Sequence, residues 1–325
     1  MSNGNNNTAA SKKEKKYSQS REIWKRFKKN PLAMIGLVIL ILMFILALVA
    51  DFAAPSVDGM PGYNLQDWTR ARQFPSGEHL FGTDNLGRDI FSRIAHGARF
   101  SLAFGFVIVG IGVTAGVILG STAGFYGGLA DNIIMRITDI LLAMPNILLA
   151  IAIVAALGRD MVNIMIAVGI AAIPGYARIV KAQVLTVKNQ EFVEAARSCG
   201  ASNFRLIFRH ILPNCMAPII VESTMGVAGG ILSAAGLSFI GIGIQAPLPE
   251  WGAMLSEGRL FMLAGYWHMT LFPGLFIAML IFSLNMMGDG LRDAFDPRLR
   301  GANFSKRKFK RLQQERLKVE AGEAN

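Results

Sequence analysis

The sequence is poor in charged residues, cysteine and histidine. Only 17% of its 325 residues are charged, whereas soluble domains carry about a quarter. Two cysteines, Cys199 and Cys215, cannot build a disulfide framework, and the four scattered histidines lack the spacing of a zinc site. A GxxxxGK(S/T) phosphate-binding motif is also missing. We therefore expect no metal, no other cofactor, no catalytic residues and no nucleotide site of its own.

Apolar sequence is abundant. Hydrophobic residues make up 52% of the chain, and the mean hydropathy is +0.41. A membrane-spanning helix needs roughly 20 mostly apolar residues. Six stretches contain candidate spans, of which the fourth is the shortest: residues 32–50, 100–130, 140–158, 161–177, 215–249 and 260–288. The sequence therefore predicts an all-α membrane protein with six transmembrane helices.

The first apolar stretch follows a basic segment, as the core of a secretory signal peptide does. Its basic leader is some thirty residues long, and its apolar run exceeds the roughly 7–15 residues of a signal core. We therefore interpret residues 32–50 as an uncleaved membrane anchor.

The basic residues predict the orientation of the spans. Of the 33 Lys and Arg, nine precede residue 32, six lie between the fourth and fifth spans, and ten follow the sixth. With six spans, these three segments share one side of the membrane. Because basic loops mark the cytoplasmic side, both termini are predicted to be cytoplasmic. The net charge of +11 thus reflects membrane topology, and we expect no nucleic-acid partner.

The loop 189–214 has the most unusual sequence. Residues 191–199 are predicted to form a short helix ending at Gly200, and Ser202 can cap a second helix that ends before Pro213. Either a partner protein, or the chain's own helix ends or the lipid surface, covers the apolar face of the second helix. That face follows i, i+3, i+4, i+7 spacing: Phe204, Ile207, Phe208 and Ile211.

Several motifs carry a family resemblance. Glu194-Ala195-Ala196, Gly200 after three further residues, and then Ile211-Leu212-Pro213 resemble the EAA loop of permease subunits in bacterial ABC importers. Two positions depart from the family pattern: His210 replaces an apolar residue and Ala234 an acidic one. The resemblance covers about residues 20–300. Four further segments resemble landmarks of the C-type subunits of dipeptide and oligopeptide permeases: residues 79–89, 237–243, 251–258 and 288–298.

The resemblance implies the type I ABC importer permease fold, in the cytoplasmic membrane of a bacterium. The chain would then divide into a basic cytoplasmic tail, a first helix with its extracytoplasmic loop, a five-helix core that contains the loop 189–214, and a second basic tail. The corresponding ranges are 1–31, 32–98, 99–290 and 291–325.

The resemblance also implies partners within the lipid bilayer and beside it. These are a homologous B-type permease, two ATP-binding subunits that hydrolyse ATP, and an extracytoplasmic solute-binding protein. The chain itself would be a transport subunit and not an enzyme. The residues that would couple it to the ATP-binding subunits are Glu191, Glu194, Ala195, Ala196, Gly200, Phe204, Ile211, Leu212 and Pro213.

Charged residues near the spans form a second set of candidates. Asp139 flanks the third span, where we expect it to pair with Arg136 at i−3. Glu222 near the start of the fifth span either faces the transport pathway or reaches the cytoplasmic interface. The first loop adds three residues that pair locally or contact the solute-binding protein: Asp84, Arg88 and Asp89.

A dipeptide or oligopeptide is the solute that the resemblance favours, and nickel or another small solute is the alternative, because nickel permeases share these motifs. An ion-coupled secondary transporter would need inverted repeats and carboxylates deep in its spans. A membrane enzyme would need convergent catalytic side chains. The sequence shows neither pattern clearly.

Overall fold

The computed structural model describes residues 19–53 and 60–296. The greater part of both basic tails, residues 1–18 and 297–325, lies outside the described residues. Within the described part the regular elements are helices, which confirms the all-α fold class.

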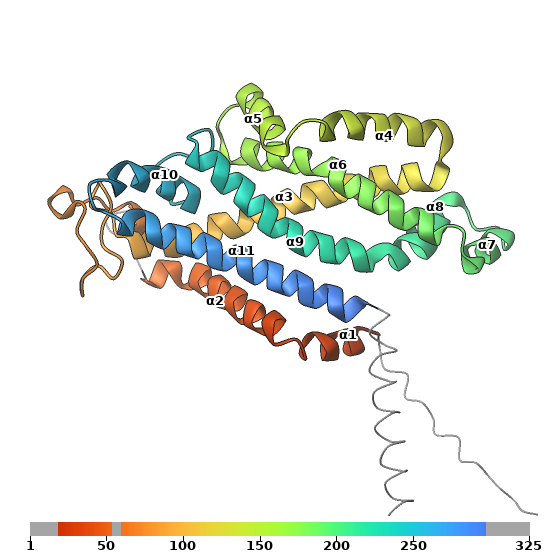
Figure 1. Cartoon of the computed structure of the whole chain (residues 1–325), viewed down its shortest axis with the longest axis horizontal. Coiled ribbons are helices and arrows are strands. Elements are labelled where there is room, and N and C mark those ends of the chain that lie inside the picture. The colour runs from red at the N-terminus through yellow and green to blue at the C-terminus, as the bar shows by residue number, and fades with distance from the viewer. Residues whose placement is uncertain (1–18, 54–59, 297–325) are drawn as a thin grey trace, which may run out of the picture.

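Long apolar helices run side by side along the length of the molecule (Figure 1). By length and composition, five helices of the described part can cross a membrane. They are α2 (Pro31–Ala53), α3 (Ile90–Tyr126), α6 (Met161–Val187), α9 (Leu212–Phe239) with the short turns before it, and α11 (His268–Phe295). The shorter α-helices are α1 (Gln19–Phe27), α4 (Gly128–Leu142), α5 (Asn146–Leu157), α7 (Glu191–Ser198), α8 (Asn203–Arg205) and α10 (Trp251–Met262).

The third predicted span is not one straight helix. Helices α4 and α5 meet at an angle of 92°, and the predicted stretch 140–158 straddles the break between them. Pro145 explains the break, because proline has no N–H for the preceding turn and disfavours helical geometry at Met144. Counted as one bent span, this pair brings the total to the predicted six.

Other helices extend beyond their apolar stretches. Helix α3 begins at Ile90, so the predicted boundary between residues 98 and 99 falls inside it. Helix α6 continues through Pro174 and ends at Val187. The last predicted stretch, 260–288, covers the end of α10, a turn and most of α11. Runs of apolar residues locate the spans but not their ends, because a helix can continue past the bilayer.

Small residues allow the spans to pack closely. A Cβ atom added at Gly116 of α3 would clash with the side chain of Tyr176 on α6, and one added at Gly290 of α11 would clash with Ala33 of α2. Between membrane helices, such close packing replaces the hydrophobic effect as the source of association.

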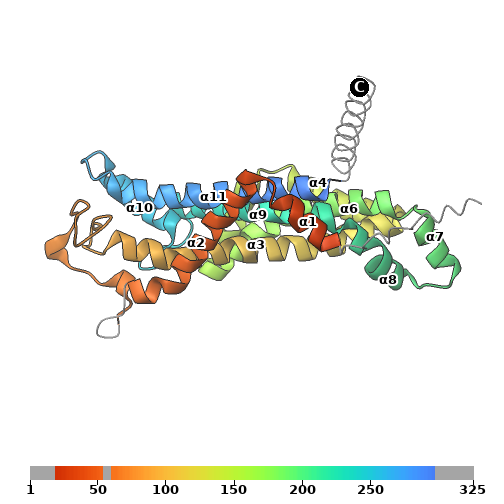
Figure 2. The same cartoon turned by 90° about the horizontal axis from the view of Figure 1, so that it is seen from below.

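The two ends of the bundle are formed by different segments of the chain. Helices α7 and α8 lie at one end, whereas α10 and the loop 60–89 lie at the other (Figures 1 and 2). Helix α1 and the last turns of α11 lie in the half of the molecule toward α7. The structure thus groups the segments that the basic residues predict to be cytoplasmic.

Candidate functional site

Residues 188–211 form an elbow at one end of the bundle (Figure 1). Gly200 ends α7 with a left-handed φ of 80°, a conformation that favours glycine. The amide of Ala201 donates to the carbonyl of Ala196 at 3.1 Å, which closes the helix in a Schellman arrangement. The hydroxyl of Ser202 then accepts from the amide of Arg205 at 3.4 Å. These contacts confirm the predicted succession of helix, glycine and capped helix. The predicted end of the second helix before Pro213 is wrong, because the helical backbone continues from Asn203 into α9 and ends at Phe239.

The second helix of the elbow is not a regular α-helix. Residues Leu206–Ile211 form a π-helix, whose i→i+5 hydrogen bonds place more residues in each turn. The predicted single apolar face is therefore wrong. Ile207 is buried, whereas Phe204 and Phe208 are 70% and 51% exposed, with ring centroids 4.4 Å apart.

The predicted coupling residues divide into an exposed group and a buried group. Glu191, Glu194, Ala195, Gly200, Phe204 and Pro213 are exposed, Ala196 is half-buried, and Ile211 and Leu212 are buried. The buried pair packs with Val193 against the ends of α6 and α9. Lys188 also donates to the carbonyl of Gly124 on α3 at 2.8 Å. The elbow is therefore fixed to the bundle on one side and open on the other.

The opposite end carries a cap, defined here as residues 60–89 and 240–267, which is tied to α3 by buried ion pairs. Arg88 and Arg93 are each 1% exposed. Arg88 donates to Asp84 at 2.6 Å and to Glu257 at 2.7 Å, and Arg93 donates to the same two carboxylates at 2.6 and 2.7 Å. Two cations and two anions thus neutralise one another, as buried charges require.

The three candidate residues of the first loop make contacts within the chain. Asp84 and Arg88 belong to the buried ion network, as the local-pairing interpretation predicts, and Asp89 caps α3 by accepting from the amide of Ser92 at 2.7 Å. Contact with a solute-binding protein stays a prediction. Arg93 and Glu257 were not among the predicted site residues, because Glu257 lies 169 residues from Arg88 and no local spacing links them.

Helix α10 is held in the cap by its first residues. Glu250 is buried, and its carboxylate accepts from the amides of Gly252 and Ala253 at 2.9 and 2.8 Å. Burial raises the pKa of Glu250, which the two amide donors only partly offset. The indole N–H of Trp251 donates to the carbonyl of Ile94 on α3 at 3.1 Å. The cap is therefore a firmly anchored structure.

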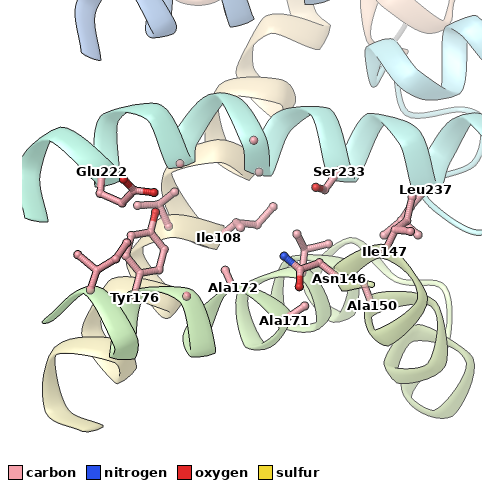
Figure 3. Close-up of a pocket in the computed structure, with 17 residues that line it drawn as sticks. Ile108, Asn146, Ile147, Ala150, Ala171, Ala172, Tyr176, Glu222, Ser233 and Leu237 are labelled. Carbon is pink, nitrogen blue, oxygen red and sulfur yellow. The ribbon is translucent and has the colours of Figure 1, made fainter. Parts of the chain in front are cut away.

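A cavity of about 260 Å³ lies between α3, α5, α6 and α9 (Figure 3). Apolar side chains and glycines line most of it, and Glu222 is the charged residue in its wall. Asp139 does not line the cavity. Its carboxylate pairs with Arg178 of α6 at 2.7 Å on an exposed surface, so the predicted pairing with Arg136 is wrong.

Comparisons with known proteins place the chain among transport permeases. Residues 112–301 match the family described as binding-protein-dependent transport system inner membrane component. Residues 18–75 match the N-terminal transmembrane domain of oligopeptide transport permease C.

Two curated relatives cover most of the chain. It is 47% identical over 280 residues to the dipeptide transport system permease protein DppC of Alkalihalophilus pseudofirmus, covering 86% of this chain and 90% of the relative. It is 46% identical over 280 residues to the glutathione transport system permease protein GsiD of Escherichia coli O157:H7, covering 86% and 91%.

One solved structure has a similar fold at low sequence identity. A chain of the MetNI methionine ABC transporter in an inward-facing conformation aligns with a TM-score of 0.51 and 19% identity, covering 63% of this chain and 97% of that chain. The likeness supports the predicted type I importer permease fold.

Proposed function

The chain belongs to the family of binding-protein-dependent transport system inner membrane components, and we propose that it is the permease subunit of an ATP-driven peptide importer. The two relatives are named for dipeptides and for glutathione, which is itself a tripeptide. Peptides are the solute class that these names share, and we assign that class to this chain.

The elbow is the observation that carries the proposal. Its outer side exposes two aromatic rings beside the acidic first turn and small residues of α7. Exposed aromatic residues next to a glycine turn are suited to a protein interface. We assign this surface to an ATP-binding subunit, with Glu194, Ala195 and Phe204 among the contacts.

The buried side of the elbow provides a route for coupling. Val193 and Ile211 pack in one cluster with Val184 of α6 and Ile219 of α9. The same two helices line the cavity, through Tyr176 and Glu222. A displacement of the elbow by the ATP-binding subunits would therefore move two walls of the cavity as rigid helices.

The proposal includes further partners and a location. A homologous B-type permease forms the other half of the pathway in the bacterial cytoplasmic membrane. Two ATP-binding subunits hydrolyse ATP on the side of the elbow, and an extracytoplasmic solute-binding protein docks on the side of the cap.

The test is uptake of labelled dialanine by the complete importer that contains Glu194→Lys. We expect the variant to insert normally and to lose uptake, because the reversed charge disrupts the interface. Glu22→Lys, on an exposed residue of α1 outside the elbow and the cap, is the matched control and should keep uptake. Normal uptake by Glu194→Lys would contradict the coupling role. A wild-type importer that carries labelled Ni²⁺ and not dialanine would contradict the peptide assignment.

A further inference from the structure

Glu222 is an ionisable residue of α9 in the interior of the bundle, next to Tyr176 of α6 in the cavity wall. Within the described residues, its carboxylate takes part in no ion pair and no side-chain hydrogen bond. It lies ten residues after Leu212, roughly 15 Å along α9, and therefore away from the end of the helix. Charged residues within membrane bundles are energetically unfavourable, and those that occur commonly have a function.

The cavity beside Glu222 is open and otherwise neutral. Figure 3 shows Glu222 and Tyr176 at one end of it, and Asn146 and Ser233 farther along. Gly229 faces open space, because an added Cβ would meet no atom within 4 Å. The wall of the cavity thus carries one negative charge and several neutral polar groups.

We propose that Glu222 binds the ammonium group of a basic side chain as a peptide passes through the cavity, an inference that rests on the proposed function. An ammonium group that leaves water for an apolar cavity needs a compensating partner. A carboxylate provides it through a charge-assisted hydrogen bond. Asn146, Ser233 and Tyr176 can serve the peptide amides, because amide and hydroxyl groups both donate and accept.

The same charge makes the cavity selective. A lone carboxylate in surroundings of low polarity attracts a cationic side chain and repels an anionic one. Glu222 is only half-buried, so water can replace the ammonium and let the peptide leave. Peptides with a basic side chain should therefore pass most readily, and peptides with an acidic side chain least readily.

The experiment compares uptake of three labelled dipeptides by the complete importer in proteoliposomes, at saturating solute-binding protein. The probes are lysyl-alanine, dialanine and alanyl-glutamate. We expect Glu222→Gln to lower the ratio of lysyl-alanine to alanyl-glutamate uptake by about tenfold, as expected for one charge-assisted contact. Glu222→Asp should keep most of the ratio. Asp139→Asn, which neutralises a carboxylate outside the cavity, is the matched control and should leave the ratio unchanged.

The ratio of lysyl-alanine uptake to alanyl-glutamate uptake does not depend on the amount of assembled importer, because both uptake rates scale with that amount. If Glu222 instead pairs with a cation of the partner permease, Glu222→Gln lowers uptake of all three dipeptides equally, and the inference is overturned. An unchanged ratio with normal uptake also overturns it and leaves peptide import intact. If the wild-type importer carries none of the three dipeptides, the proposed function fails, and this inference fails with it.

Discussion

The cap and the elbow lie at opposite ends of the same bundle and are stabilised in opposite ways. The cap holds Arg93 of α3 buried between two of its carboxylates, and Trp251 of the cap donates to the backbone of α3. In the elbow, Phe204 and Phe208 are exposed, and their tilted rings contact each other. The cap is fixed by buried polar contacts made within the chain, whereas the elbow presents an exposed surface that another protein would cover.

Because of this difference, effects on the stability of the fold can be separated from effects on coupling to the ATP-binding subunits. Substitutions in the cap should lower the free energy of unfolding, because they remove contacts made within the chain. Substitutions on the outer side of the elbow should leave folding intact and weaken assembly. The following variants test that separation, in order of their expected effect on stability.

Arg93→Ala should have the largest effect. It leaves the buried Asp84 and the partly exposed Glu257 with one cation in place of two, and breaking a buried network costs about 3–5 kcal/mol. Thermal unfolding of the purified chain in detergent measures the loss. Arg70→Ala is the matched control, because the ion pairs of Arg70 are exposed and each is worth less than about 1 kcal/mol. Equal losses would show that the buried network does not stabilise the cap.

Glu250 should make the stability depend on pH. Since burial raises its pKa above the ordinary value of 4.5, the folded chain binds the proton more tightly than the unfolded chain. The contribution of Glu250 to stability should be greatest below pH 4.5 and should be lost as the pH rises through the raised pKa of this residue. Unfolding temperatures of wild type and Glu250→Gln, measured across this range, should diverge, with this loss absent in the variant. Parallel curves would rule out Glu250 as the cause.

Gly200→Ala should cost about 1 kcal/mol, because alanine is strained at a φ of 80°. Gly241→Ala is its counterpart in the cap, where φ is 85° and an added Cβ also meets open space. We expect both variants to lower the unfolding temperature by similar amounts, but only Gly200→Ala to slow uptake. A similar loss of uptake in both would mean that the elbow has no special role.

The double variant Phe204→Ser, Phe208→Ser should change stability least, within about 0.5 kcal/mol, because both rings are exposed. It should nevertheless weaken co-purification of the ATP-binding subunits, as loss of aromatic interface residues usually does. Leu80→Ser, at an exposed position of the cap, should affect neither measurement. Unchanged co-purification in the double variant would remove the main argument for docking at the elbow.

Local sequence was sufficient for much of the elbow. Gly200 and Ser202 were identified as the end of one helix and the cap of the next, because capping involves only neighbouring residues. The prediction of a single apolar face on the second helix was wrong, because the conformation of that helix depends on contacts with distant segments. The π-helix forms where Leu206, Ile207 and Ile211 become buried against α6 and α9.

The sequence by itself determined the all-α class and the approximate position of the spans, and it predicts the side of the membrane on which the basic segments lie. Length, hydropathy and charge are sums over neighbouring residues, and the membrane acts on those sums. Only the tertiary structure decided that Arg88 and Arg93 meet Glu257, and that Glu222 faces a neutral cavity. These facts depend on contacts between segments far apart in the chain, which form when the helices pack.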